Sequence, residues 1–354
     1  MTPANRTPRP SVGVIIPCYN YGRYLRECVQ SVVEQEGVDV RALIIDDASS
    51  DGSAGIAQAL AATDARIEVR AHAVNQGHIQ TYNEGLQWVT GTYTVLLSAD
   101  DMLTPGSLQR ACALLDAHPE VGFAYGRCTI TRDDRPRPPA PTGPAVWTIW
   151  AGQEWLARRC QAAENCIICP EVVVRTSLLR QLGGYDPKLP HTADFELWMR
   201  IAAYASVGYI RGPHQAYYRD HAAGMHHARF GAVLPELKQY AAAFDILFRN
   251  HGEVIADRAR LETVARRMLA KRTLLAACRA YDRGAPPLAA VAELEQLALT
   301  TDADAPATPE WRGLRWRKRL GPQASRWLWP FLPPCIVPRL VRRARRPFQR
   351  SAGL

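Results

Sequence analysis

The sequence lacks several features that would assign a chain of this length to a common class. It has no apolar run of about 18 residues, so no simple helix is expected to span a membrane. It shows no signal-peptide pattern, because residues 1–11 are rich in Pro and Arg and the first apolar run, residues 12–17, is too short. It contains neither GxGxxG nor GxxxxGK(S/T), which leaves dinucleotide-binding and P-loop proteins without support.

Cysteine occurs without a useful pattern. The nine cysteines are scattered and odd in number, and without a signal peptide they indicate reduced thiols in the cytoplasm. Cys166 and Cys169 form a CxxC pair, but no second pair with metal-ligand spacing accompanies them. A zinc or redox role stays open for the pair, while burial as small apolar side chains is favoured.

Acidic residues are missing from one end of the chain. Residues 312–350 contain twelve Lys or Arg and no Asp or Glu, although the whole chain has 43 basic and 34 acidic residues and a net charge of +9. The rest of the chain therefore carries a net charge of −3. The body of the protein is mildly acidic, and its basic character lies in the C-terminal tail.

What the chain does contain is a regular alternation of short apolar runs and amphipathic segments. Strands are expected at residues 12–17, 40–47, 67–71, 93–97, 122–125 and 171–175. Helices are expected at residues 24–34, 53–60, 79–89 and 106–117, and two or three more between 227 and 283. This alternation is typical of a doubly wound α/β fold with a mainly parallel sheet.

Polar clusters follow three of the expected strands. The triplet CYN (18–20) follows the first strand, DD (46–47) ends the second, and DD (100–101) follows the fourth. Ligands of doubly wound sheets bind beyond the carboxyl ends of the strands. We therefore expect these three clusters to converge at one edge of the sheet.

The order of these clusters resembles a known family. The stretches that carry the resemblance are VIIPCYNYGRYLRECVQSVVEQ, LIIDDASSDGS, NQGHIQTYNEGLQWVTGTYTVLLSADD, LGGYDPKLPHTADFELWMRIA and YYRDH. Across residues 10–222 they resemble family 2 glycosyltransferases of the GT-A fold. The resemblance implies a Rossmann-like α/β domain that moves a sugar from a nucleotide-diphosphate donor, most often a UDP-sugar, to an acceptor hydroxyl.

By this resemblance, residues at the carboxyl edge bind the donor. Tyr19 would stack on the base and Asp47 would accept a hydrogen bond from it, because aromatic rings stack on flat bases and carboxylates accept from N–H groups. Asp46 and Asp47 point in opposite directions, so Asp46 is the candidate for tying down the loop. The nucleotide contacts expected are Pro17, Tyr19, Asn20, Asp46, Asp47, Asn75 and Asp100.

The stretch LLSADD raises the question of a metal site. The family often carries an Asp-any-Asp triplet there, whereas here Ser98 stands first, with Asp100 third and Asp101 next. The resemblance implies Mn²⁺ or Mg²⁺ that neutralises the departing diphosphate, held by Asp100, Asp101 and His221 of YYRDH. A phosphate contact or a surface position is the alternative for His221, and a solvated strand end is the alternative for LLSADD.

The segment HTADFELWMR carries the expected catalytic base. By resemblance this base is Asp194, with Ala193 where the family often has Glu. Helical geometry supports the choice, because Asp194 and Glu196 lie about 200° apart around a helix. Glu196 stands four residues before Arg200, an order that favours a surface ion pair. Trp198 is a candidate acceptor contact, and packing in the core is an equal alternative.

The chain is expected to fall into five segments. They are a disordered arm (1–11), the nucleotide-sugar half of a GT-A domain (12–132), its acceptor and catalytic half (133–225), a helical extension (226–300) and a basic Trp/Pro/Arg-rich tail (301–354). Residues 311–350 combine cations with Trp, so we expect peripheral contact with anionic lipid at the inner face of the cell membrane. A partner protein or a disordered tail is the alternative, and nucleic acid is disfavoured.

The sequence therefore predicts an inverting, metal-dependent hexosyl- or N-acetylhexosaminyltransferase. Its acceptor would be a saccharide or a lipid-linked molecule in cell-surface polysaccharide or glycoconjugate synthesis. Two alternatives are a nucleotidyltransferase on a similar sheet and a catalytically inactive sugar-nucleotide binder. The first would need a glycine-rich loop with Arg and Lys where PCYNYG stands, and the second would lack the base or the metal acids, which are present.

Overall fold

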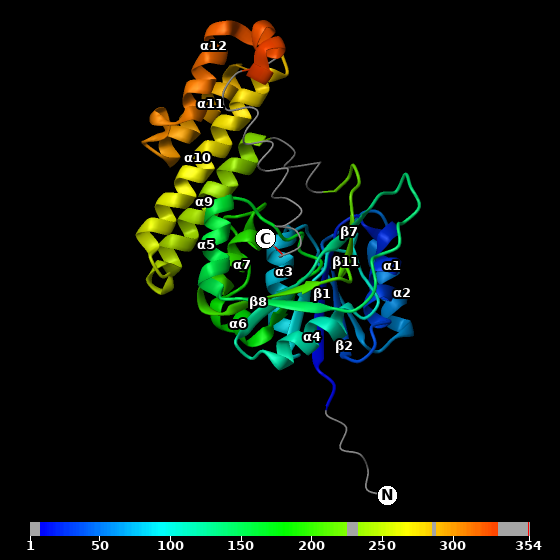
Figure 1. The fold of residues 1–354 in the computed structure, drawn as a ribbon. Coiled ribbons are helices and arrows are strands. Elements are labelled where there is room, and N and C mark those ends of the chain that lie inside the picture. Colours follow the sequence, from blue (N-terminus) through cyan, green and yellow to red (C-terminus); the bar gives the residue numbers. More distant parts are fainter. Residues whose placement is uncertain (1–7, 225–232, 285–287, 332–352, 354) are drawn as a thin grey trace, which may run out of the picture.

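The computed structural model describes residues 8–224, 233–284, 288–331 and 353. A central sheet carries helices on both faces, and a group of long helices extends beyond one side of it (Figure 1). The first described residues, which begin at position 8, and the far end of this helical group lie at opposite ends of the molecule.

The N-terminal half follows the alternation expected from the sequence. Its strands are β1 (Ser11–Cys18), β2 (Asp39–Asp46), β3 (Ile67–Ala71), β4 (Tyr93–Leu96) and β6 (Val121–Tyr125). Its helices are α1 (Gly22–Val33), α2 (Ser53–Thr63), α3 (His78–Trp88) and α4 (Ser107–Ala117). Each element predicted in this half is confirmed, with boundaries that differ by a few residues.

The main sheet has eight strands in the order β3-β2-β1-β4-β9-β6-β10-β8. β1 pairs in parallel with β2 and β4, and β2 pairs in parallel with β3, so the carboxyl ends of these strands share one edge. β9 (Val173–Arg175) is antiparallel to both neighbours, and β8 (Val146–Trp150) is antiparallel to β10 (Ser206–Arg211). The prediction of a mainly parallel sheet is confirmed, although β8 and β10 were not expected.

Side chains alternate between the two faces of β1 and enter two separate cores. Val14 and Ile16 belong to the core beneath α1 and α4, together with Leu25 and Leu108. Ile15 faces the opposite core, which continues through α3 into the helices of the C-terminal half. Because both faces of β1 are covered, its sequence is a continuous apolar run rather than an alternating one.

A small second sheet lies beside the carboxyl edge of the main one. It consists of β5 (Met102–Leu103), β11 (Ala216–Arg219) and β7 (Cys128–Thr131), in that order. β11 pairs antiparallel to β5, which directly follows the stretch LLSADD. This pairing brings the end of YYRDH next to the acids at positions 100 and 101, across more than a hundred residues of chain.

The C-terminal half contributes helices that pack on one face of the sheet and then on one another. Those of the α/β domain are α5 (Gly152–Ala162), α6 (Thr176–Leu182) and α7 (Ala193–Tyr204). Those of the extension are α9 (Val233–His251), α10 (Arg258–Asp282), α11 (Leu288–Thr301) and α12 (Pro309–Leu328). Three short 3₁₀ helices accompany them: η1 (Gly252–Val254), η2 (Ala305–Ala307) and η3 (Trp329–Phe331). The helices expected between 227 and 283 are confirmed within the described residues.

The helical extension continues beyond the boundary predicted at residue 300. α12 packs along α10, and the fully buried guanidinium of Arg317 donates to Asp282 at the end of α10 over 2.8 Å. α12 is interrupted at Gly321, which has a φ of 78° and stands directly before Pro322. Its first part therefore belongs to the packed extension, while the predicted tail residues 332–352 lie outside the described residues. None of the described helices is both long enough and apolar enough to cross a bilayer.

The ion pair between Glu196 and Arg200 is buried, contrary to the surface pair expected from sequence. Arg200 donates to Glu196 over 2.7 Å, and both side chains are almost fully enclosed. The guanidinium also donates to the carbonyls of Leu182, Gly183 and Gly184, where α6 ends. Helical spacing identified the pair, but it carries no information about which face of α7 is covered.

This pair yields a stability prediction. We expect Arg200→Ala to destabilise the protein by about 3–5 kcal/mol, because Glu196 and three carbonyls would lose their buried partner. In the matched control Arg158→Ala, which breaks the exposed pair with Glu154, the loss should be at most about 1 kcal/mol. Urea unfolding followed by circular dichroism measures both, and equal losses in the two variants would contradict the burial argument.

Candidate functional site

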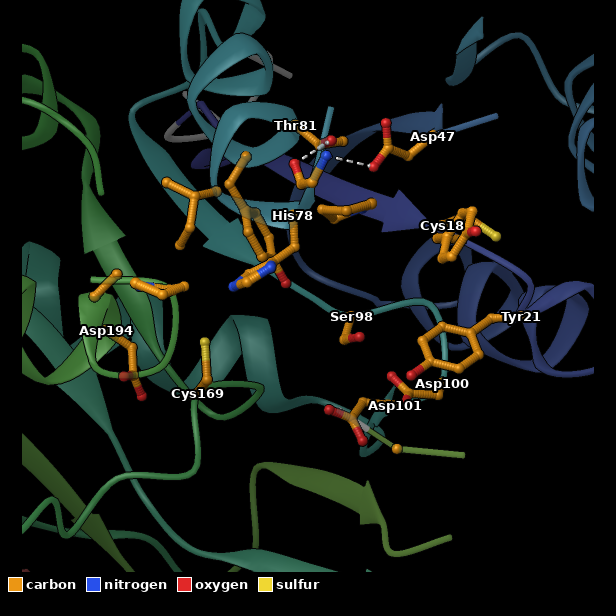
Figure 2. A pocket seen from close by; sticks show the side chains of 18 of the residues that line it. Cys18, Tyr21, Asp47, His78, Thr81, Ser98, Asp100, Asp101, Cys169 and Asp194 are labelled. Atoms are coloured by element: carbon orange, nitrogen blue, oxygen red, sulfur yellow. Dashed lines mark hydrogen bonds between the residues drawn. The ribbon is translucent and has the colours of Figure 1, made fainter. Parts of the chain in front are cut away.

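A cavity of about 530 Å³ opens at the carboxyl edge of the parallel strands. Figure 2 shows Asp47, the adjacent Asp100 and Asp101, and Asp194 at three separate places around it. These side chains come from the ends of β2 and β4 and from the start of α7. The convergence expected from the sequence is therefore present, and the volume is in the usual range for a small-molecule site.

One end of the cavity is formed by the turn after β1. Pro17, Tyr19 and Asn20 all line it, and the ring of Tyr19 is 43% exposed. Asn20 has a φ of 58°, and its side-chain oxygen accepts from the backbone N–H of Ser50 over 2.8 Å. Asn20 thus fixes the turn to the loop after β2 and leaves the ring of Tyr19 free to meet a flat ligand.

The neighbouring acids Asp46 and Asp47 have different surroundings. Asp46 turns away from the cavity and accepts from the backbone N–H of Ser49 over 3.1 Å, so it braces the loop. Asp47 lines the cavity and accepts from the backbone N–H groups of Gln76 and Gly77 over 2.7 and 2.9 Å. The structure therefore places only Asp47 where it can touch a nucleotide.

Asn75 lies beside the same acid. It lines the cavity, and its amide donates to the backbone carbonyl of Asp47 over 3.2 Å. The contact ties the loop before α3 to the end of β2. Asn75 is therefore brought to the expected place, where it shapes the cavity wall next to Asp47.

Asp100, Asp101 and His221 meet at the other end of the cavity. Nε2 of His221 lies 3.0 Å from Oδ2 of Asp100, and Oδ1 of Asp101 accepts from the backbone N–H of Arg219 over 2.8 Å. All three line the cavity and are buried. LLSADD is thus a buried strand end, and His221 is not a surface residue.

Several observations fit a divalent cation at this end. Oδ1 of Asp100 is buried without a hydrogen-bond partner among the described residues, as is Nδ1 of His221. Burial and the neighbouring Asp100 raise the pKa of Asp101 well above its ordinary value, and a positive charge nearby would favour the ionised form of Asp101. Carboxylate oxygens with one imidazole suit Mn²⁺ or Mg²⁺.

The protein groups alone do not complete a coordination shell. Within residues 8–224, 233–284 and 288–331, no set of three or more His, Cys, Asp or Glu side chains is arranged to hold a metal, and this includes Asp100, Asp101 and His221 as they lie here. A cation held here would need further ligands from water or from a bound diphosphate. Ser98 also lines the cavity and has a hydroxyl where the family triplet often has a carboxylate.

Asp194 stands on the opposite wall, at the start of α7. Its Oδ2 accepts from the side-chain amide of Asn165 over 2.9 Å. Burial raises the pKa of Asp194 to about 6, and hydrogen bonds from the backbone and from Asn165 oppose that rise. A carboxyl group with this pKa is ionised at neutral pH and able to take up a proton.

Trp198 does not face the cavity. Its side chain is 1% exposed and packs against Phe123 of β6, with ring centroids 5.4 Å apart. The predicted acceptor contact is therefore corrected to the alternative, a core residue. The reason is that α7 is enclosed on nearly every side, so a spacing of four residues from Asp194 does not place a side chain beside the ligand.

Four residues of the site were missed by sequence reasoning. Asn165 holds Asp194, His72 contacts Asp47, Tyr185 lines the cavity, and Arg219 donates to the backbone carbonyl of Asp100 over 2.9 Å. None of them belongs to an acidic cluster, although His72 directly follows the strand predicted at 67–71. Tyr185 and Arg219 lay in stretches that were singled out, LGGYDPKLPHTADFELWMRIA and YYRDH, but neither residue was given a role.

The CxxC pair consists of two free thiols. Cys169 lines the cavity, and its Sγ lies 3.5 Å from the hydroxyl of Tyr185. Burial raises the pKa of Cys169, so the thiol is protonated at neutral pH and poorly nucleophilic. The favoured interpretation, thiols that pack as small side chains, fits these surroundings.

A mainly parallel sheet whose carboxyl edge holds these acids, with helices on both faces, is the arrangement expected of the GT-A fold. Residues 13–180 match the model of the family described as Glycosyl transferase family 2. The matched residues make up slightly less than half of the chain. The resemblance noted in the sequence and the predicted fold are both confirmed.

Individual relatives are distant. An uncharacterized glycosyltransferase, alr2836 of Nostoc sp., is 29% identical over 224 residues, which cover 61% of this chain and 66% of that protein, slightly less than two thirds. The crystal structure of S. aureus TarS 1-349 in complex with UDP-GlcNAc has a TM-score of 0.60 at 14% identity and covers 89% of each chain. The mannosyltransferase PcManGT from Pyrobaculum calidifontis, in complex with GDP-Man and Mn²⁺, has a TM-score of 0.51 at 20% identity, covering 92% of this chain and 88% of that one.

Proposed function

We propose that the protein is an inverting glycosyltransferase that uses a nucleoside-diphosphate sugar, with a UDP-sugar as the favoured donor. The observation that carries the proposal is the position of Asp194, which faces Asp47, Asp100 and Asp101 across one cavity. The acceptor is a hydroxyl of a saccharide or a lipid-linked molecule in cell-surface polysaccharide or glycoconjugate synthesis, and the sugar is a hexose or an N-acetylhexosamine. UDP-GlcNAc in the TarS structure supports this donor class.

The donor would lie along the carboxyl edge of the sheet. Tyr19 offers its exposed ring to the base, and Asp47 has a carboxylate in the wall to accept a base N–H. The diphosphate would then reach the end of the cavity with Asp100 and Asp101. The sugar would lie between that end and Asp194.

Asp100, Asp101 and His221 are the residues that would hold Mn²⁺ or Mg²⁺. The unpartnered Oδ1 of Asp100 and the two adjacent buried carboxylates support a cation there, and Mn²⁺ is present in the PcManGT structure. When bound, the cation would neutralise charge that develops on the departing diphosphate.

Asp194 is the proposed catalytic base. Its carboxylate removes the proton of the acceptor hydroxyl as that oxygen forms a bond to the anomeric carbon, and the bond to the diphosphate oxygen breaks with its electron pair. A single in-line displacement of this kind inverts the anomeric centre. Asn165 holds the carboxylate in place without taking up its proton, since an amide nitrogen only donates.

The base assignment predicts both a variant effect and a pH limb. Asp194→Asn should lower kcat by about 10²- to 10⁴-fold and leave UDP binding intact, because the amide cannot take up the proton. In the wild type, kcat/KM should fall about tenfold per unit as the pH drops below about 6, where Asp194 is protonated. Steady-state transfer assays and calorimetric titration with UDP measure the two effects.

The exposed acid Asp245 in α9 offers a matched control, and Asp245→Asn should retain full turnover. Near wild-type transfer by Asp194→Asn would remove Asp194 from the mechanism.

The metal assignment predicts that the acids after β4 control metal-dependent turnover. Asp101→Ala should abolish the stimulation of UDP release from UDP-sugars by Mn²⁺ or Mg²⁺. The control Asp134→Ala, which changes an exposed acid in the loop after β7, should not. A screen of UDP-sugar hydrolysis with and without each cation is the measurement. Full metal-dependent activity in Asp101→Ala contradicts the assignment, and wild-type protein that releases no nucleotide from any donor supports an inactive binder.

We further propose that the C-terminal basic segment, residues 311–350, contacts an anionic membrane surface. In its described part, Trp316, Trp327 and Phe331 are exposed, the last two at 80% and 82%. Arg315 and Arg319 are exposed on the same helix, and the region lies at the far end of the helical extension (Figure 1). Cations that attract anionic lipid and aromatic rings that enter the interface support a peripheral contact, which would bring a lipid-linked acceptor close.

This contact predicts selective binding to charged vesicles. The wild type should sediment with vesicles that contain phosphatidylglycerol and not with pure phosphatidylcholine, and added salt should weaken the binding. The double variant Trp327→Ala/Phe331→Ala should bind about tenfold more weakly, while Val254→Ala, an exposed apolar residue elsewhere, should bind as the wild type does. Unchanged binding in the double variant would contradict the proposed contact.

A further inference from the structure

His72, directly after β3, lies behind the nucleobase end of the cavity. Its Nδ1 is 2.8 Å from Oδ1 of Asp47, and its Nε2 is 2.8 Å from Oε2 of Glu84 in α3. The side chain is almost fully enclosed and does not line the cavity. His72 therefore contacts a residue of the site without being able to touch a ligand.

The hydrogen bonds of Asp47 leave one place for a ligand. Its Oδ1 accepts from His72 and from the backbone N–H of Gln76, which fills the two lone pairs of that oxygen. Its Oδ2 accepts only from the backbone N–H of Gly77, shown by a dashed line in Figure 2. The second lone pair of Oδ2 is available at the cavity wall.

The charges around His72 favour its doubly protonated form. Carboxylates face it on both sides, Asp47 from the end of β2 and Glu84 from α3, and an imidazole can donate to both only when both nitrogens carry a proton. Burial lowers the pKa of His72, but its hydrogen bonds to Asp47 and Glu84 outweigh burial and raise the pKa above its ordinary value. Arg70 approaches from β3 and pairs with Glu84 over 3.1 Å.

We propose that His72, held by Glu84, is a positioning residue that fixes the carboxylate of Asp47 so that its Oδ2 accepts the imino N–H of a uracil base. The inference rests on the proposed function, in which Asp47 faces the base. His72 acts only on recognition of the base and has no direct role in sugar transfer.

A consequence follows for the pH dependence of donor binding. When His72 loses a proton, one of its nitrogens presents a lone pair to a carboxylate, and the fixed orientation of Asp47 is weakened. Affinity for a base with an imino N–H should therefore fall as the pH rises through the raised pKa of His72. Affinity for 3-methyl-UDP, which has a methyl group in place of that proton, should not follow the same curve.

Two substitutions separate the two contacts of His72. In His72→Asn, the amide nitrogen replaces Nδ1 and can still donate to Asp47. In His72→Gln, the amide nitrogen replaces Nε2, so it reaches Glu84 and leaves Oδ1 of Asp47 with only the Gln76 donor. Glu84→Gln keeps an acceptor for Nε2 but removes the negative charge that favours protonated His72.

The experiment is calorimetric titration of wild type and variants with UDP and with 3-methyl-UDP, in a fixed excess of Mg²⁺, between about pH 6 and pH 8. The ratio of the two affinities cancels changes in phosphate ionisation, because both nucleotides carry the same diphosphate. We expect His72→Gln to reduce the preference for UDP about tenfold, the effect of one hydrogen bond to a charged group, while His72→Asn retains it. Glu84→Gln should shift the loss of preference to lower pH.

The outcomes distinguish this inference from the proposed function. Wild-type protein that binds neither nucleotide contradicts the proposed function. Wild-type protein that prefers UDP, together with an undiminished preference in His72→Gln, contradicts the role of His72 alone. Retained binding of 3-methyl-UDP by each variant shows that it is folded, and an equal loss of both nucleotides in the two His72 variants would mean that His72 only supports the structure. In transfer assays, the donor KM of His72→Gln should rise while kcat at saturating donor stays unchanged.

Discussion

The parallel pairing of β1 with both β2 and β4 is the constraint on which the site depends. It aligns three strand ends, so that the turn with Tyr19, the acid Asp47 and the pair Asp100–Asp101 open on one edge. Apolar side chains on both faces of β1 hold this register, because a shift by one residue would move Val14 and Ile16 into the wrong core. The chemistry of the cavity thus rests on residues that never touch a ligand.

The cost of this arrangement is buried negative charge, which the structure offsets differently at each place. Asp47 receives two backbone N–H groups and a histidine, which suits a carboxylate held in one orientation. Asp194 receives a side-chain amide and backbone hydrogen bonds and has its pKa raised to about 6, which suits a carboxylate that takes up a proton. Asp101 has one backbone donor beside a second acid, which suits a carboxylate that needs a cation. Their different surroundings separate three chemically identical groups into three proposed roles.

Features that depend on a local sequence pattern could be predicted from the sequence. Asp47 and Asp100 follow apolar β-rich runs, so the shared edge of the sheet could be inferred before any contact was known. His72 also follows a predicted strand, but its contact with Asp47 and that of Asn165 with Asp194 could not be inferred, because they depend on which residues meet in space. The same limit explains the errors on α7: helical spacing gives the angle between side chains, whereas the helices packed around α7 decide that Trp198 and the Glu196–Arg200 pair are enclosed.

The small sheet bears on why the triplet Ser98–Asp100 can begin with a serine. A carboxylate at position 98 would place a third acid beside Asp100 and Asp101, two that already share a buried wall. β11 instead pairs with β5 and brings the imidazole of His221 to Asp100, which adds a nitrogen group to this wall without a further carboxylate. In the proposed metal site the missing acid is therefore replaced by a residue more than a hundred positions away. A pattern search confined to the triplet would report a damaged site, because it cannot see that the pairing of β11 with β5 brings His221 next to Asp100.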